Sequence, residues 1–230
     1  MLRANPISTI KSTSSSQWQS APVFSPSWSN PTLVGLKRAF DLIVSIFTIV
    51  LLSPILLVVA LAVRLSSQGP ILYRWRVVGQ AGRPFTGYKF RSMCVDADRL
   101  KQELECRNEM TGPVFKLTKD PRITPLGRWM RRYSLDELPQ LFSVVKGDMS
   151  LVGPRPPLAT EYARFTEYQK QKLSVKPGIT CLWQVKGRND VKEFDQWVEL
   201  DLEYIRRWNP KLDLWILAMT AIEVFAGSGK

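Results

Sequence analysis

The sequence predicts a mostly helical α+β protein, in which an N-terminal membrane segment precedes a compact domain with a small β-hairpin. Three observations lead to this fold class. Leu42 to Val63 is a run of 22 residues without a charge, with Ser53-Pro54 at its centre. Two segments rich in β-branched and aromatic residues, 71–78 and 85–93, flank a glycine-containing turn and predict the hairpin. Most of the remaining chain reads as helices separated by Gly and Pro turns.

The apolar run is long enough to cross a bilayer, because a helix of this length rises about 33 Å. Pro54 lacks the amide hydrogen that would bond the carbonyl of Val50, and its ring clashes with that turn. The hydroxyl of Ser53 is placed to bond the freed carbonyl. Two topologies remain open from these residues: a kinked helix that spans the membrane, and two half-helices that enter and leave by the same face.

The charges that flank the run lack the asymmetry of a typical spanning helix. Both flanks contain cations and no acid: Arg3, Lys11, Lys37 and Arg38 within 1–40, and Arg64, Arg74, Arg76, Arg83, Lys89 and Arg91 within 64–95. A re-entrant helix-break-helix would keep both on one face. We therefore expect a disordered Ser/Pro-rich tail over 1–35, a membrane segment over 36–65 and a compact cytosolic domain over 66–230.

The composition favours anionic partners and excludes histidine chemistry. The 230 residues include 32 Lys and Arg against 20 Asp and Glu, a formal net charge of +12. Such a balance suits nucleic acid, anionic lipid or phosphorylated small molecules. The chain has no histidine, which rules out imidazole catalysis and histidine metal ligands. Cys94, Cys106 and Cys181 have no CxxC spacing and are expected to be reduced thiols.

Helices are expected over 93–110, 158–173, 194–208 and 212–225. The third contains an apolar stripe, and Asp201 lies on that stripe. A carboxylate on an apolar face needs a partner. A metal or a catalytic cation would supply one, and an ordinary structural pair with a lysine or arginine would do so equally well.

Adjacent acids, Asp136 and Glu137, follow a basic stretch that contains Lys119, Arg122, Arg128, Arg131 and Arg132. On spacing alone a capping box is the commoner explanation, since Ser134 and Glu137 fit S-x-x-E at a helix start. Neighbouring helical residues point about 100° apart, so the two carboxylates also suit two different chemical roles. One would attack phosphorus and the other would hold Mg²⁺, while arginines bind the phosphate oxygens.

The segment from Ser134 to Pro156, SLDELPQLFSVVKGDMSLVGPRP, resembles the signature of the bacterial sugar transferases. These are monotopic phosphoglycosyl transferases, also called polyprenyl-phosphate hexose-1-phosphate transferases. The resemblance runs from about Lys37 to the C-terminus through the motifs KRAFD, Ser53-Pro54, YKFRSM, DPRIT, VKPGIT, LWQVKGR and LDLEYI. One departure is Cys181, which stands where the family pattern has glycine after PGIT, and which affects the local backbone fit.

The resemblance implies a two-step reaction. A UDP-sugar binds with Mg²⁺, and Asp136 attacks the phosphorus attached to the sugar and expels UMP. The phosphosugar then passes from the enzyme to a polyprenyl phosphate such as undecaprenyl phosphate, which initiates exopolysaccharide, capsule or O-antigen synthesis. By the same resemblance Glu137 binds the metal, and the other site residues are the phosphate-binding Lys89, Arg131 and Arg155 and a further acid, Asp201.

Ser53 and Pro54 match the family's re-entrant break, so the resemblance favours a monotopic chain in the bacterial inner membrane. Its catalytic domain would lie on the cytoplasmic face, where the acceptor phosphate meets anionic lipid. The LWQV motif favours UDP-glucose or UDP-galactose over N-acetylated sugars as the donor. A homodimer is the default expectation for such an enzyme.

A different class of protein also fits the composition. The basic balance and eight tryptophans are compatible with a membrane-tethered nucleic-acid-binding protein, or with an adaptor that has no catalytic activity. However, the cations cluster around acids instead of forming a continuous basic stripe, and no helix-turn-helix or zinc spacing is present in the sequence. We therefore expect no nucleic-acid partner.

Overall fold

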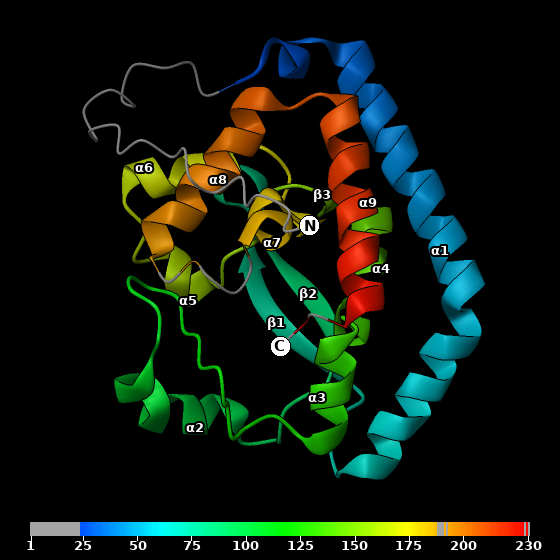
Figure 1. The fold of residues 1–230 in the computed structure, drawn as a ribbon, viewed down its shortest axis with the longest axis vertical. Helices are drawn as coiled ribbons and strands as arrows, with labels where there is room; N and C mark the ends of the chain where they lie inside the picture. The colour runs from blue at the N-terminus through cyan, green and yellow to red at the C-terminus, as the bar shows by residue number, and fades with distance from the viewer. Residues whose placement is uncertain (1–23, 188–190, 192, 228, 230) are drawn as a thin grey trace, which may run out of the picture.

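The computed structural model describes residues 24–187, 191, 193–227 and 229 (Figure 1). Its long helices are α1 (Pro31–Ser66), α8 (Phe194–Arg207) and α9 (Pro210–Ala226). The shorter helices are α2 (Ala97–Leu104), α3 (Pro125–Arg132), α4 (Gln140–Lys146), α5 (Ala159–Tyr162), α6 (Glu167–Lys170) and α7 (Leu182–Gly187). The strands are β1 (Leu72–Val78), β2 (Pro84–Phe90), β3 (Ser150–Val152) and β4 (Gly178–Thr180). The mostly helical α+β class is confirmed.

Helix α1 contains the whole apolar run. It begins after Asn30, whose side-chain oxygen accepts hydrogen bonds from the amides of Thr32 and Leu33 at 3.0 and 3.3 Å. The helix continues through Pro54, so the expected interruption is a bend within one helix of 36 residues. Figure 1 shows the two halves of α1 pointing in different directions. The Ser53 hydroxyl donates to the Val50 carbonyl at 2.8 Å, which confirms its predicted role.

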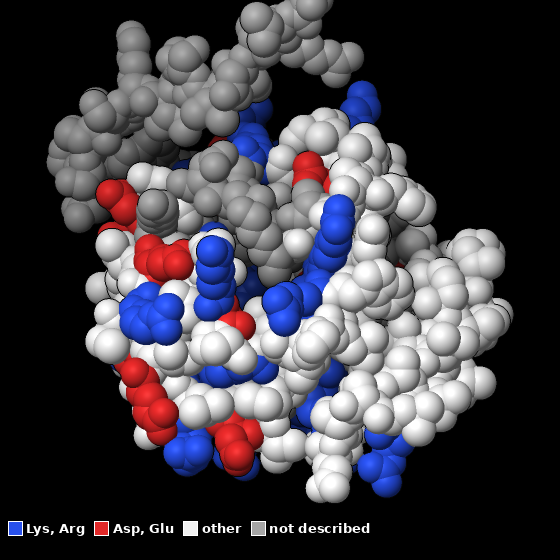
Figure 2. All heavy atoms as spheres, turned by 60° about the horizontal axis from the view of Figure 1, so that its bottom comes forward, with Lys and Arg blue, Asp and Glu red and all other residues white. Residues whose placement is uncertain are grey.

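Most of the apolar surface of α1 faces away from the rest of the protein. Its most apolar 18-residue window has a mean hydropathy of 2.9, and only 11% of that window is buried, so α1 is long and apolar enough to cross a membrane. Figure 2 shows the corresponding side of the molecule as a broad surface with few charges. The exposed apolar side chains of α1 include Ile43, Ile46, Phe47, Val50, Leu51, Leu57, Val58, Leu61 and Leu65.

The N-terminal half of α1 is joined to the domain by the charged residues of the KRAFD motif. Lys37 forms an ion pair with Asp213 of α9 at 2.6 Å and donates to the Val152 carbonyl at 3.1 Å. Asp41 is 3% exposed and accepts a hydrogen bond from the Ser150 hydroxyl at 2.7 Å. These buried polar contacts fix the helix against β3 and α9.

Arg91 holds the other end of α1. This guanidinium is 7% exposed and donates to the carbonyls of Val63, Ser67 and Gln68 at 3.3, 2.7 and 3.0 Å. These bonds satisfy carbonyls at the helix end that have no partner within the helix. Both ends of the apolar helix are therefore bound to the same domain by buried charged side chains.

The predicted hairpin is confirmed as an antiparallel pair of β1 and β2, with Trp75 opposite Gly87. Gly87 has to be glycine, because a Cβ there would lie 2.4 Å from Nε1 of Trp75. The basic side chains at the end of this hairpin do not simply face solvent. Arg91 is buried and Lys89 is only partly exposed, because both side chains pair with other parts of the fold.

The main core lies where α8 and α9 pack with α4, α7 and the short parallel pair of β3 and β4. Residues 158–173 were expected to form one helix, but they form α5, α6 and the start of a 3-10 helix at Gln171–Ser174. The interruptions occur where Thr166 caps a new helix with its side chain. Helix α8, with its apolar stripe, matches the predicted segment closely.

The expected tail over 1–35 extends too far. Residues 1–23 lie outside the described part, whereas Pro26–Ser29 is a 3-10 helix and α1 begins at Pro31. Trp28 stacks on Trp208 with ring centroids 4.0 Å apart, and the Ser25 hydroxyl donates to the Trp208 carbonyl at 2.8 Å. Aromatic burial against α8 thus orders residues that their composition places in a tail.

We predict that Arg91→Met lowers the free energy of unfolding by about 2–4 kcal/mol, because several buried carbonyls lose a charged donor. For a chain of this size that corresponds to a fall in Tm of roughly 4–16 °C, measurable by differential scanning fluorimetry in detergent micelles. The matched control is Arg99→Met, whose ion pair with Glu103 is 68% and 59% exposed and should contribute little. Equal effects of the two substitutions would contradict the proposed role of Arg91.

Candidate active site

The acid pair lies on a short 3-10 helix, Leu135–Glu137, which directly follows α3. Ser134 adopts a left-handed conformation with φ of +53°, and its side chain makes no capping bond. The capping-box explanation is therefore wrong, because Ser134 turns the chain instead of capping a helix. A left-handed serine is a strained arrangement of the kind that is often found at functional sites.

Asp136, Glu137 and Lys89 meet at the start of this turn. Asp136 is 6% exposed. Lys89 reaches across from β2, and its Nζ lies 2.7 Å from Oε1 of Glu137 and 4.6 Å from the centre of the Trp75 ring. Lys89 is thus held between a carboxylate and an aromatic face. The sequence did not identify Trp75, although its place opposite a glycine on the neighbouring strand was a usable signal.

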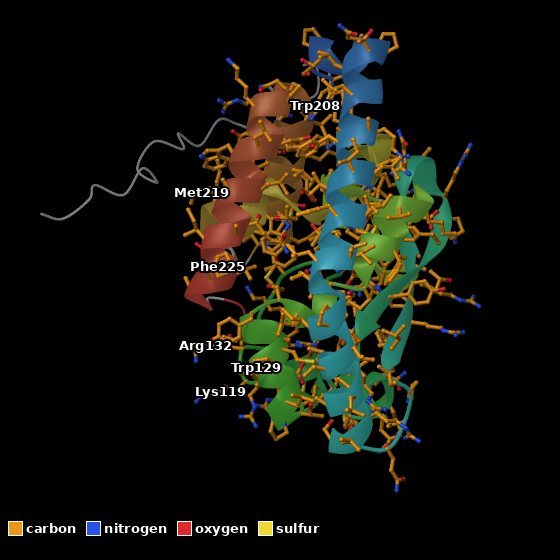
Figure 3. All side chains as sticks on the ribbon, turned by 90° about the vertical axis from the view of Figure 1, so that its right-hand side faces the viewer. Lys119, Trp129, Arg132, Trp208, Met219 and Phe225 are labelled. Carbon is orange, nitrogen blue, oxygen red and sulfur yellow. The ribbon has the colours of Figure 1, made fainter. Side chains whose placement is uncertain are left out.

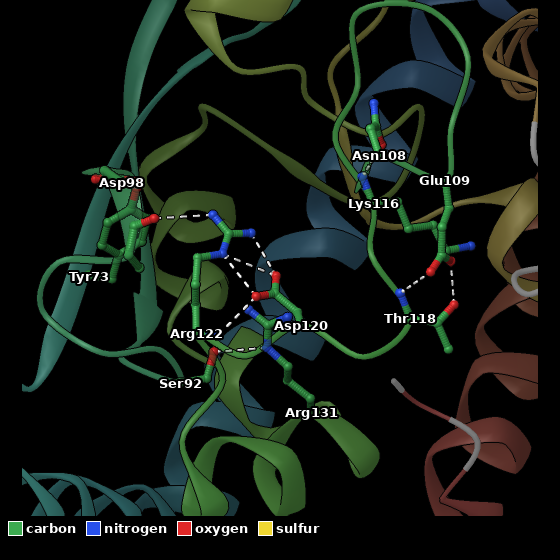
Figure 4. A network of polar contacts seen from close by, with 11 residues as sticks. Tyr73, Ser92, Asp98, Asn108, Glu109, Lys116, Thr118, Asp120, Arg122 and Arg131 are labelled. Atoms are coloured by element: carbon green, nitrogen blue, oxygen red, sulfur yellow. Dashed lines mark hydrogen bonds and ion pairs between the residues drawn. The ribbon is translucent and has the colours of Figure 1, made fainter. Parts of the chain in front are cut away.

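Arg131, at the end of α3, supplies the second cation beside the acids. Its Nε donates to the Ser92 hydroxyl at 3.0 Å (Figure 4). Burial lowers the pKa of Arg131, and this is partly offset by the negative charges of Asp136, Asp120 and Glu137. Lys89, Arg131, Asp136 and Glu137 were all predicted site residues, and the structure brings these four together.

Arg122 is engaged in a different way from the other cations of the basic stretch. It binds Asp120 through Nε and Nη2, with Nη2 to Oδ2 at 2.6 Å (Figure 4). It also donates to the Ala97 carbonyl at 3.2 Å and is 6% exposed. Arg122 therefore organises the loop before α3, and Asp120 places a third acid near Arg131 that the sequence did not identify as a site residue.

Burial raises the pKa of Asp136 above its ordinary value, and the adjacent Glu137 raises it further. Lys89 and Arg131 lower it, but they offset only part of the effect. The negative charge of ionised Asp136 is therefore only partly compensated in the folded protein. A site of this kind favours binding of an additional cation.

The donor set suits a metal that arrives with its substrate. Among the described residues, no group of three or more Cys, Asp or Glu side chains converges on one point. Mg²⁺ in phosphate chemistry is commonly bound by one or two carboxylates together with substrate phosphates and water. The Asp136–Glu137 pair fits that requirement, whereas it does not fit a closed structural metal site.

Arg155 and Asp201 lie in a second cluster. Asp201 is fully buried, and its Oδ2 is 2.5 Å from Nζ of Lys172. Burial raises the pKa of Asp201, and Lys172 and Arg155 lower it in part. Cys181 lies nearby, and burial together with Asp201 raises the pKa of its thiol. The pair with Lys172 favours the structural interpretation of Asp201. The roles of Arg155 and Asp201 in binding substrate stay predictions, because the ion pair of Asp201 is formed with Lys172.

A cationic cavity of about 740 Å³ opens on the other side of Arg131. Lys119, Arg128 and Arg132 line it together with Arg131 and Asp120. Figure 3 shows Lys119 and Arg132 on one edge of the molecule, close to Trp129. The sequence showed this basic stretch as a run of cations, but it did not show which of them would line one cavity with Arg131.

The chain belongs to a family of known transferases. The model of the family "Bacterial sugar transferase" matches residues 32–227, which include α1 and nearly all of the described domain. This result confirms the resemblance drawn from the sequence motifs. It also favours the transferase interpretation over the nucleic-acid-binding and adaptor hypotheses.

Several curated proteins are similar to it. "Galactosyl transferase CpsE" of Streptococcus agalactiae is 50% identical over 161 residues, which are 70% of this chain and 36% of that protein. "Undecaprenyl-phosphate galactose phosphotransferase" of Salmonella typhimurium is 43% identical over 198 residues, 84% of this chain and 41% of that protein. "Exopolysaccharide production protein ExoY" of Sinorhizobium fredii is 39% identical over 197 residues, 84% of this chain and 87% of that protein. The chain thus spans about two fifths of the first two relatives.

We predict that Asp136→Asn stabilises the protein at pH 8. The folded-state pKa of Asp136 lies above the unfolded value of about 3.8, so the native state binds this proton more tightly than the unfolded state. Its stability therefore falls as pH rises through the interval between the two values, and the asparagine variant escapes that loss.

The measurement is Tm of both proteins in detergent between pH 4 and pH 8. The difference should be largest at pH 8 and shrink toward acid. Asp96→Asn, a change at an exposed carboxylate, serves as the control. A variant that is less stable than the parent at pH 8 would show that Asp136 is well compensated and would contradict this assignment.

Proposed function

We propose that this protein transfers a hexose 1-phosphate from a UDP-sugar to undecaprenyl phosphate, with release of UMP. The observation that carries this proposal is the buried Asp136, flanked by Glu137, Lys89 and Arg131 and set next to a helix suited to lipid. Membership of the bacterial sugar transferase family and the printed name of the Salmonella relative support it.

In the first step the Asp136 carboxylate attacks the phosphorus that bears the sugar. A bond forms between the carboxylate oxygen and phosphorus, and the bond from phosphorus to the UMP oxygen breaks, so that UMP leaves with the electron pair. Desolvation of Asp136 strengthens it as a nucleophile once positive charge from the substrate complex holds it ionised. Arg131 and Lys89 stabilise the charge that develops on the phosphate oxygens.

In the second step an oxygen of the acceptor phosphate attacks the same phosphorus. The bond from Asp136 to phosphorus breaks, and the carboxylate is regenerated. Glu137 is the residue that would hold Mg²⁺, which would neutralise the diphosphate of the donor. Lys89 contacts Glu137 directly. If Glu137 bound the metal, the ammonium group of Lys89 would be released from that carboxylate and could pair with a substrate phosphate instead.

The contacts at the two ends of α1 support a re-entrant topology. If α1 crossed the bilayer, Lys37 and Arg91 would lie at opposite faces, yet both belong to contacts with one polar domain. That domain would then have to lie at membrane depth, with its charged side chains in hydrocarbon. We propose instead that α1 dips into one leaflet and bends at Pro54, with the domain on the cytoplasmic face of the inner membrane.

The names of the similar proteins bear on the identity of the donor sugar. Two of the similar proteins have galactose or galactosyl in their names, and we propose UDP-galactose or UDP-glucose as donor. The name of the Sinorhizobium relative supports a place in exopolysaccharide production. A homodimer stays a prediction.

A nucleic-acid-binding role has little support from the surface. Figure 2 shows blue and red side chains interspersed on the face that carries the charges, without a continuous basic stripe. Non-specific binding of nucleic acid requires an array of cations that follows the phosphate backbone.

We predict that Asp136→Asn lowers UMP release from UDP-galactose or UDP-glucose by at least about 10³-fold, since it removes the nucleophile. Glu137→Gln should retain measurable activity at high Mg²⁺ and should raise the Mg²⁺ concentration needed for half-maximal rate. The assay follows UMP in the presence of undecaprenyl phosphate.

Glu103→Gln, at an exposed acid outside the site, is the control and should behave as the parent. Denatured protein from a rapidly quenched reaction with radiolabelled sugar donor should retain label in the parent but not in Asp136→Asn. Full UMP release by Asp136→Asn would remove Asp136 from the mechanism.

A further inference from the structure

We propose that an apolar groove between α1 and α3 binds the polyprenyl chain of the acceptor and thereby aims its phosphate at Asp136. The groove has a volume of about 260 Å³ and includes Pro54, the residue at which α1 bends. Its walls are Pro54, Val58 and Ala62 from α1 and Leu126 and Trp129 from α3, with Met130 at its base. This inference rests on the proposed function and deepens it by locating one half of the acceptor.

The chemistry of the lining selects a hydrocarbon ligand. Every residue that lines the groove is apolar, so a ligand with polar groups would lose hydrogen bonds to water and gain none there. Val58 and Trp129 are 67% and 50% exposed, and the groove is therefore open at its rim. Trp129 is an aromatic residue of the kind that is enriched at membrane–water interfaces.

Helix α3 separates this groove from the cationic cavity. Leu126, Trp129 and Met130 face the groove, whereas Arg128, Arg131 and Arg132 line the cavity. One amphipathic helix thus presents an apolar surface on one side and phosphate-binding cations on the other. A single ligand with a long apolar chain and a phosphate end matches both surfaces, whereas a soluble nucleotide matches only the cations.

The groove and the residue that precedes the acid pair border the same small core cluster. Val59 and Met130 line the groove and belong to a small core cluster with Phe90. Leu135 packs against the same cluster. Phe90 directly follows Lys89, and Leu135 directly precedes Asp136. A chain that lies in the groove therefore starts close to the reacting groups.

The advantage of the groove is positional. In lipid an apolar surface gains little free energy by binding another apolar chain, because lipid tails fill the same space. A groove of fixed direction instead restricts where the acceptor phosphate can lie, and such positioning lowers the barrier of the transfer step. We therefore expect changes in the groove to affect the acceptor step and to spare the donor step.

The experiment compares Ala62→Trp, which fills the groove, with Leu61→Trp, which adds the same side chain at a neighbouring exposed position outside it. Exchange of labelled UMP into the UDP-sugar reports the donor step alone and should be unchanged in both variants. Transfer to undecaprenyl phosphate in nanodiscs should show a KM raised about tenfold in Ala62→Trp and changed less than about twofold in Leu61→Trp.

A second measurement identifies the occupant directly. Benzoylphenylalanine is placed at Val58, on the rim of the groove, or at Leu57, outside it. After illumination in nanodiscs of phosphatidylglycerol with undecaprenyl phosphate, mass spectrometry should find polyprenyl adducts at Val58 and phospholipid adducts at Leu57. Phospholipid adducts at both positions, or unchanged acceptor KM in Ala62→Trp, would overturn the proposal. Loss of UMP exchange in the parent protein would instead overturn the proposed function.

Discussion

Buried charged side chains at the two ends of α1 are the interaction on which the rest of this structure depends. Lys37 and Asp41 fix the first half of the helix to α9 and β3, and Arg91 holds the carbonyls at its end. Removing one partner of such a buried contact typically costs about 2–5 kcal/mol, so the helix and the domain form one unit. The exposed apolar surface of α1 therefore has a fixed orientation relative to the domain, and the proposed re-entrant insertion would present that surface to lipid.

The same strand connects this arrangement to the chemistry. Arg91 and Lys89 are two residues apart on or just after β2, and the first holds the membrane helix while the second pairs with Glu137. Asp136 lies beside them in a turn that Ser134 enters with left-handed backbone, and its charge is only partly compensated. A carboxylate held in this state is unfavourable for stability but suitable for catalysis, a trade-off that is common at active sites.

Local sequence signals predicted the local features well. Alternating β-prone residues around a glycine turn gave the hairpin, and the proline geometry gave the bond from Ser53 to Val50. The acid pair and its neighbours Lys89 and Arg131 came from motifs. The failures concern features that depend on contacts distant in sequence. Trp28, which its composition places in the tail, is ordered by Trp208, and the partner of Asp201, which the sequence left open, is Lys172. The capping box failed because S-x-x-E constrains spacing but does not specify the backbone angles of Ser134.

The central claim is that both ends of α1 lie on the cytoplasmic side, and accessibility of introduced thiols tests it most directly. Thr32→Cys and Gln68→Cys flank the apolar run at exposed positions, in a chain whose Cys94 and Cys106 are replaced by serine. We expect a membrane-impermeant maleimide to label neither position in intact cells and both in inverted membrane vesicles, while a periplasmic cysteine protein in the same cells is labelled from outside. Labelling of either position from outside in intact cells would contradict the account and leave α1 as a spanning helix.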